Sequence, residues 1–301
     1  MKRALIVGGD GQDGQLLQIR LQSEGTIVTV LGRGDVVVDE FESVLAHVAS
    51  APDEIYYLAA YHHSSQDAME LNELDLYRRS RSVHVDGLMN FLEAIRQSAP
   101  QTRLFYAASS LIFGTSASEM QNELTAINPR CFYGITKAAG LQCCRLYREK
   151  HGVFASGGIL FNHESPLRQP KFVIPKIVRA AVAIARGSEE RLRLGDLAAR
   201  VDWGYAPDYV DAMSRILRLP SPDDFVIATG ETHSVQSAVE MVFKHLGLDW
   251  REHVEESPNV LTRNRAVLCG DARKLRIATG WAPSMSFPEM LKVLLDAQLH
   301  G

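Results

Sequence analysis

Three glycines near the start of the chain constrain its fold most strongly. Gly8, Gly11 and Gly14 stand three residues apart. The run 3–8 is apolar and rich in β-branched residues, and the stretch 12–24 has leucines mostly on one side of a helix. Glycine lets the backbone turn tightly between a strand and a helix. This order of strand, turn and helix predicts the first unit of a parallel α/β sheet.

Short apolar runs alternate with helical patterns through the first half of the chain. We predict strands at 26–31, 54–58, 103–108 and 153–160, and helices at 40–48, 68–98 and 131–150. Such alternation is typical of a Rossmann-type, doubly wound parallel sheet with helices on both faces. We expect residues 1–160, completed by about 205–228, to form this domain.

The pattern loosens after residue 160, where prolines interrupt it. Helices are predicted at 173–185, 207–217, 234–246 and 287–299, with a short polar-apolar stretch at 191–194 and a strand-like stretch at 224–228. We expect residues 161–204 and 229–301 to form a smaller C-terminal α/β lobe that binds the substrate.

Composition excludes several classes of function. The net charge of −4 argues against nucleic acid as a partner, and no apolar run approaches the roughly 18 residues of a membrane span. The four cysteines lack metal-ligand spacing, so we expect reduced thiols in a cytoplasmic protein and no metal.

A tyrosine and a lysine, Tyr133 and Lys137, stand four residues apart in a helical pattern and therefore share one face. A phenol has a reference pKa of about 10, and a nearby ammonium lowers it. The pair therefore predicts proton transfer at a carbinol or carbonyl while a nicotinamide exchanges hydride. Ser109 or Ser110, at the end of a strand, is expected to hydrogen-bond the same oxygen; neighbours on a strand face opposite ways, so both stay candidates.

The glycine turn predicts a dinucleotide pyrophosphate at the following helix N-terminus. Arg33, after the second strand, stands where an acidic residue would bind the ribose 2′-hydroxyl of NAD. Its guanidinium favours the 2′-phosphate of NADP, although a solvated loop residue is the alternative. Asp39 is a candidate for the adenine amine or for a helix cap. We expect NADP, with NAD as the alternative.

Several longer blocks resemble one branch of the extended short-chain dehydrogenase/reductase superfamily, the GDP-mannose 4,6-dehydratases. These blocks are residues 8–14, 158–166, 202–204, 208–210 and 226–235. The resemblance covers most of the chain and implies a nucleotide-sugar substrate, with GDP as the nucleotide.

The resemblance also implies a set of binding residues. For the cofactor these are Gly8, Gly11, Gln12, Asp13, Gly14, Arg33, Asp39, Leu58, Ala59, Ala60, Tyr133, Lys137 and His163. For the substrate they are His63, Ser110, Leu111, Asn162, Phe172, Val173, Lys176, Arg179, Gly195, Arg200 and Arg263. Lys176 and Arg179, at i and i+3, fit a diphosphate site, although a solvated cationic face is the alternative.

One departure from the family bears on the reaction. In the dehydratases a Thr, followed two positions later by a Glu, precedes the aromatic–Gly pair, and that Glu removes the C5 proton so that water leaves C6. Counted back from Phe113 and Gly114, these positions hold Ser109 and Leu111. Leucine exchanges no proton, so elimination should slow by roughly two to four orders of magnitude.

Other departures lie around the sugar and diphosphate sites. Tyr61 and His62 differ from the family pattern after the third strand, and Val201 and Gln236 replace arginines. His62 or His63 is a candidate acid, with a structural histidine as the alternative.

The preferred interpretation is an NADP-dependent nucleotide-sugar oxidoreductase acting at C4, a 4-ketoreductase or 4-dehydrogenase; a 4-epimerase also needs no such base. The first alternative is a GDP-mannose 4,6-dehydratase in which Glu123 or a histidine replaces the base. The second is a nucleotide-binding scaffold without turnover. The resemblance further suggests a homodimer.

Overall fold

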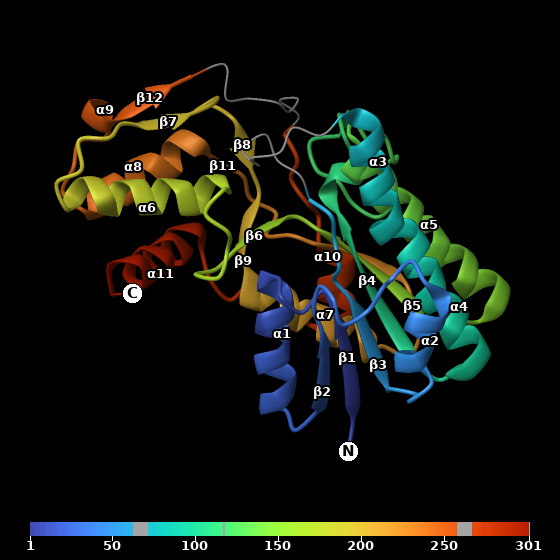
Figure 1. The fold of residues 1–301 in the computed structure, drawn as a ribbon. Helices are drawn as coiled ribbons and strands as arrows, with labels where there is room; N and C mark the ends of the chain where they lie inside the picture. Colours follow the sequence, from blue (N-terminus) through green and yellow to red (C-terminus); the bar gives the residue numbers. More distant parts are fainter. Residues whose placement is uncertain (63–71, 117, 258–266, 301) are drawn as a thin grey trace.

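A parallel sheet of six strands forms the centre of the computed structural model, which describes residues 1–62, 72–116, 118–257 and 267–300 (Figure 1). Its order is β10-β5-β4-β3-β1-β2. These strands are β1 (Arg3–Val7), β2 (Ile27–Leu31), β3 (Glu54–Tyr57), β4 (Arg103–Ser109), β5 (Ala155–Leu160) and β10 (Asp224–Ile227). The chain runs outward from β1 in both directions, so a topological switch point lies between β1 and β3. In such sheets ligands bind beyond the carboxyl ends of the strands at this point.

Helices cover both faces of the sheet (Figure 1). One face packs against α1 (Gln12–Ser23) and α7 (Ala206–Leu217), which contact each other. The other face packs against α2 (Phe41–Val48), α4 (Leu88–Ser98) and α5 (Phe132–His151). The predicted doubly wound parallel sheet is confirmed, and most predicted elements lie at nearly the predicted residues.

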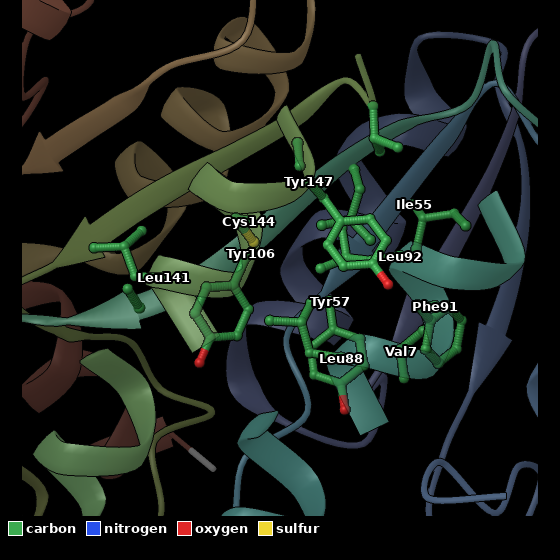
Figure 2. Close-up of a cluster of buried hydrophobic side chains, with 14 of the residues drawn as sticks. Val7, Ile55, Tyr57, Leu88, Phe91, Leu92, Tyr106, Leu141, Cys144 and Tyr147 are labelled. Carbon is green, nitrogen blue, oxygen red and sulfur yellow. The ribbon is translucent and has the colours of Figure 1, made fainter. Parts of the chain in front are cut away.

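Aromatic side chains fill the core under α4 and α5 (Figure 2). Tyr57 of β3 and Tyr106 of β4 are fully buried there. The ring of Tyr57 meets that of Phe91 edge-on, with centroids 5.3 Å apart. Packing of this kind fixes α5, and with it the residues on that helix, against the carboxyl half of β4.

The predicted helix 68–98 is wrong in part: residues 73–98 are helical but not one regular α-helix, and residues 63–71 lie outside the described chain. α3 (Glu73–Arg81) passes into α4 through a π-helical turn, Ser82–Gly87. The hydroxyl of Tyr57 donates to the carbonyl of Val83 in this turn at 2.6 Å. Insertions of this type are frequent at functional sites.

The second half of the chain adds a helical cluster beside the sheet (Figure 1). α6 (Val173–Ala185), α8 (Val235–His245) and α11 (Phe287–His300) share one apolar core. Short elements precede or join these helices: β6 (Asn162–Glu164), β7 (Leu192–Leu194), β8 (Arg200–Val201), β9 (Trp203–Tyr205), β11 (His233–Ser234), α9 (Trp250–His253), β12 (Val254–Glu256) and α10 (Arg273–Thr279). In the first half, the short turn η2 (Ser110–Ile112) follows β4 directly. Within the described ranges, no helix combines the length and apolarity that crossing a membrane requires.

Candidate active site

The first turn of α5 lies directly against the end of β4. The thiol of Cys131 caps this helix by accepting from the amide of Gly134 at 3.4 Å. A Cβ at Gly134 would lie 2.6 Å from the carbonyl oxygen of Leu111, so only glycine permits this approach. The sequence Tyr-Gly at 133–134 therefore brings the tyrosine beside residues 109–111.

Lys137 lies one turn further along α5 and is buried. Its Nζ donates to the carbonyl of Ala107 at 2.7 Å and lies 5.8 Å from the centroid of the Tyr133 ring. Burial lowers the pKa of Lys137 to about 7, although the negative charge of Asp13 opposes this shift. The amine beside the phenol therefore changes charge near neutral pH.

Two histidine rings flank the ring of Tyr133. His62 lies with its centroid 5.4 Å away and His84 with its centroid 5.0 Å away, both nearly perpendicular to the phenol. His84 belongs to the π-helical turn and is fully buried. The backbone amide of Tyr61 donates to its Nε2 at 3.0 Å, and its Nδ1 lies 2.8 Å from the hydroxyl of Thr136.

These contacts define the protonation of His84. Because Nε2 accepts, the ring proton sits on Nδ1 and points at Thr136. Burial, and next the charge of Lys137, hold the pKa of His84 well below its ordinary value. The neutral ring thus connects the loop after β3 to the first turn of α5. Sequence reasoning missed this residue, because a single histidine in a helical pattern carries no signal of its own.

Ser109 ends β4, and its hydroxyl accepts from the amide of Leu111 at 3.3 Å. Ser109 is half-buried, whereas Ser110 is 5% exposed. The difference in exposure favours Ser109 as the hydroxyl available to a substrate. Leu111, also half-buried, places an aliphatic side chain two residues further on.

Glu123, the carboxylate proposed as a substitute base, has a different partner. Its Oε1 accepts from the amide of Val226 on β10 at 2.7 Å. Burial raises the pKa of Glu123. This carboxylate therefore pairs with the edge of the sheet.

The glycine turn fits a dinucleotide. Gly8 has a φ of +90°, and a Cβ there would lie 2.6 Å from the amide nitrogen of Ala59 and 3.0 Å from the carbonyl carbon of Leu58. Ala59 and Leu58 therefore lie against the turn, and Ala60 follows them in the chain. A Cβ at Gly14 would lie 2.6 Å from the Cα of Gly9. The glycines thus let the backbone that leads into α1 approach a bound pyrophosphate closely.

A buried polar network joins this turn to the second half of the chain. Nε2 of His163 lies 3.0 Å from both carboxylate oxygens of Asp13. The amide of Gln12 donates to the carbonyl of His163 at 3.2 Å and accepts from the hydroxyl of Ser165 at 2.8 Å. Three predicted cofactor residues, Gln12, Asp13 and His163, therefore lie together.

Beside this network, burial raises the pKa of Glu164 to about 7. The guanidinium of Arg168 lies 3.6 Å from its carboxylate and opposes the shift. Arg168 also stacks on Phe172, 3.6 Å above the ring centroid, and Phe172 contacts His62 at 5.4 Å between centroids. Phe172 and the half-buried Val173 thus begin α6 next to the loop beside Tyr133.

The residues predicted to bind the substrate diphosphate do not form one cluster as Gln12, Asp13 and His163 do. Asn162 and Arg179 are exposed. Lys176 donates to the carbonyl of Arg193 at 2.7 Å, and Arg200 donates to the hydroxyl and carbonyl of Thr232 at 3.1 and 2.6 Å.

The remaining predicted residues lie at the edges of the site or outside the description. Gly195 is half-buried, and Arg33 and Asp39 are exposed. Asp39 accepts from Ser82 at 2.6 Å and does not cap α2, whose N-cap is Glu40. His63 and Arg263 lie outside the described residues. Among the residues placed by the structure, no group of His, Cys, Asp or Glu could hold a metal ion.

Comparison with known families identifies the chain. A profile of the family described as GDP-mannose 4,6 dehydratase matches residues 29–294. The chain belongs to this family. GDP-mannose 4,6 dehydratase 2 of Arabidopsis thaliana is 38% identical to it over 254 residues, which cover 83% of this chain and 66% of the plant protein. The GDP-mannose 4,6 dehydratase of Dictyostelium discoideum is 33% identical over 348 residues, covering 99% of this chain and 96% of that protein.

Solved structures share the fold across the whole chain of this GDP-mannose 4,6-dehydratase family member. RMD from Pseudomonas aeruginosa, complexed with NADPH, has a TM-score of 0.87 at 20% identity, with 100% of both chains covered. The dTDP-glucose 4,6-dehydratase of Bacillus anthracis, in complex with NAD, has a TM-score of 0.83 at 18% identity and covers 99% of this chain and 96% of its own. The fold is therefore the Rossmann-type fold of the extended short-chain dehydrogenases/reductases.

Proposed function

We propose that this chain is a nicotinamide-dependent oxidoreductase that acts at C4 of a GDP-linked sugar, as a 4-ketoreductase or 4-dehydrogenase. The observation that carries the proposal concerns Tyr133, Lys137 and Ser109: the buried amine of Lys137 lies 5.8 Å from the centroid of the Tyr133 ring, and half-buried Ser109 ends the strand against which their helix packs. Leu111 stands where elimination would need a carboxylate. Hydride transfer at C4 needs the first three residues and no base at C5.

Side chains of the protein bind the C4 oxygen of the sugar and transfer its proton. Ser109 donates a hydrogen bond to the C4 oxygen and polarises the carbonyl. The hydroxyl of Tyr133 gives its proton to the alkoxide as it forms, or accepts it in the reverse direction. Lys137, when protonated, favours the phenolate and so lowers the barrier in either direction. A bound NADP or NAD supplies or accepts the hydride.

We assign the diphosphate of the substrate to the mouth of the site. Asn162, Lys176, Arg179 and Arg263 are the proposed ligands, since guanidinium and ammonium groups pair strongly with phosphate. We assign Phe172 and Val173, at the start of α6, to the sugar, because Phe172 contacts His62 and His62 lies beside Tyr133.

A GDP-mannose 4,6-dehydratase is the second candidate, and the family comparisons favour it over the ketoreductase. The matching profile and the relatives described above carry that name. This reaction requires a group that removes the C5 proton. At position 111 the chain offers leucine, so a histidine such as His62, which contacts the Tyr133 ring, would have to act instead.

A product assay separates the two candidates. The purified chain is incubated with a panel of GDP- and UDP-sugars and their 4-keto forms, with and without NADPH or NADH. The masses of the products are then determined by mass spectrometry. The proposal predicts a gain or loss of two hydrogens at C4. Loss of water from GDP-mannose with catalytic dinucleotide would establish the dehydratase instead. No change in any sugar while dinucleotide binds would support a scaffold.

We further propose the division into a dinucleotide domain and a substrate lobe with the boundaries given above, and a homodimer. The helices that follow the third and fourth strands carry exposed apolar side chains: Leu74 of α3 is 54% exposed, and Ile135 and Leu146 of α5 are 41% and 53% exposed. Light scattering of the chain at micromolar concentration tests the dimer.

A further inference from the structure

The end of β2 lacks the acidic side chain that usually hydrogen-bonds the adenosine ribose of NAD. In sheets of this type an acidic residue at this point hydrogen-bonds the 2′-hydroxyl of NAD, and an arginine nearby accommodates the 2′-phosphate of NADP. Here Leu31 ends the strand and Gly32 follows it. Arg33 is therefore the first charged residue after the strand, and the two residues before it bring no polar side chain to this point.

A carboxylate from elsewhere occupies that position. A Cβ built on Gly32 would lie 2.5 and 2.6 Å from Oδ1 and Oδ2 of Asp10. The amide of Arg33 donates to Oδ2 of Asp10 at 2.8 Å. Asp10 belongs to the glycine turn, so the turn after β1 supplies the acidic group that the end of β2 omits.

The backbone holds Asp10 in this place. The amides of Gly8 and Gly9 both donate to the carbonyl of Leu31, at 2.9 and 3.1 Å, which ties the turn to the end of β2. The side-chain amide of Gln15 donates to the carbonyl of Asp10 at 3.0 Å. A Cβ at Gly9 would collide with Val30, so the turn packs closely on β2.

We propose that Asp10 determines the choice of dinucleotide and favours NAD(H) over NADP(H). The proposal rests on the proposed function only in taking a nicotinamide dinucleotide as the cofactor. The carboxylate of Asp10 can accept from a ribose 2′-hydroxyl but repels a 2′-phosphate, which is nearly a dianion at neutral pH. Asp35 adds a second carboxylate, which accepts from the amide of Gly32 at 2.8 Å. The guanidinium of Arg33, from which the sequence predicts NADP, attracts a 2′-phosphate, whereas the carboxylates of Asp10 and Asp35 repel it.

Binding titrations without sugar test this choice. The affinities of NADH and NADPH are measured by calorimetry for the wild type, Asp10→Asn, Asp10→Ser and Arg33→Ala. Asp10→Asn keeps an oxygen that can accept from the Arg33 amide but removes the charge, so it preserves the turn if Asp10→Ser disturbs it. Glu42→Gln, an exposed acidic residue in the first turn of α2, is the matched control.

The wild type should bind NADH more tightly than NADPH at low ionic strength. Both Asp10 variants should raise the affinity of NADPH relative to NADH by about tenfold or more, since a carboxylate and a phosphate held side by side repel each other. Arg33→Ala should lower that ratio, and Glu42→Gln should leave it unchanged. Added salt should narrow the wild-type difference.

An unchanged or lowered ratio in Asp10→Asn would overturn the inference, as would a wild type that prefers NADPH. Failure to bind either dinucleotide would overturn both this inference and the proposed function. Normal discrimination with no turnover of any sugar would overturn the proposed function alone.

Discussion

Replacing Lys137 with methionine should make the protein more stable and less active at the same time. The folded state lowers the pKa of Lys137 from 10.5 to about 7. Between these two values the unfolded chain binds a proton that the folded chain does not. Lowering the pH through this window therefore favours unfolding, and below pH 7 the full penalty is present.

The size of the effect follows from the same shift. A pKa displaced from 10.5 to about 7 corresponds to on the order of 5 kcal/mol. Methionine fills a similar volume but loses the hydrogen bond to the carbonyl of Ala107, which offsets about 1–3 kcal/mol. A net gain of about 3 kcal/mol raises the melting temperature of a chain of this length by roughly 5 °C.

Thermal denaturation of the wild type and of Lys137→Met, at pH 6.5 and at pH 10, measures this difference in melting temperature. The variant should melt higher at pH 6.5 and no higher than the wild type at pH 10, where the buried amine is neutral. Its kcat should fall by about 100-fold or more, because the phenol loses its cation. Lys150→Met, on the exposed end of the same helix, should change neither property. A variant that melts lower than the wild type at pH 6.5 would refute the reasoning.

Three further variants test Tyr133, its neighbour His84, and the polar network beside the glycine turn. Glu164→Gln should raise the melting temperature at pH 8 and not at pH 4.5. Burial raises the pKa of Glu164 to about 7, so the cost of burying its charge in the folded state grows as the pH rises from 4.5 through 7. Glu189→Gln, at an exposed position, should leave the melting temperature unchanged at both pH values. His84→Phe keeps a ring but loses its bonds to the Tyr61 amide and the Thr136 hydroxyl. Its kcat should fall by roughly 10- to 100-fold with dinucleotide affinity intact; an unchanged kcat would remove His84 from the site. Tyr133→Phe should lower kcat by about 10²–10⁴-fold and still bind dinucleotide, whereas a scaffold would keep its biological function.

Local sequence patterns predicted the frame of the molecule. The glycine turn at residues 8–14 and the helical spacing of Tyr133 and Lys137 are short-range features, and each is set by steric or periodic rules that one segment obeys alone. Both appear in the structure within a parallel sheet whose order could be argued from strand and helix alternation.

Features that depend on two distant segments were missed. The π-helical turn that carries His84 is bonded to a distant strand, since the hydroxyl of Tyr57 donates to the carbonyl of Val83, 26 residues away. Asp10 stands beside Gly32 only because the turn bonds to the end of β2. The pairs β8 with β11 and β6 with β9 have only two or three residues per strand, too few to show a period.

The central claim is that this site moves hydride at C4 without a base at C5, and deuterium incorporation measures this most directly. The chain is incubated in heavy water with GDP-mannose, its 4-keto-6-deoxy form and either dinucleotide, and the sugars are examined by NMR. The account predicts that C4 of the 4-keto sugar gains protium from the reduced dinucleotide and no deuterium from the solvent. It also predicts that GDP-mannose keeps its water and that C5 of GDP-mannose carries no deuterium. Enzyme-dependent deuterium at C5 of a product that has lost water would contradict it.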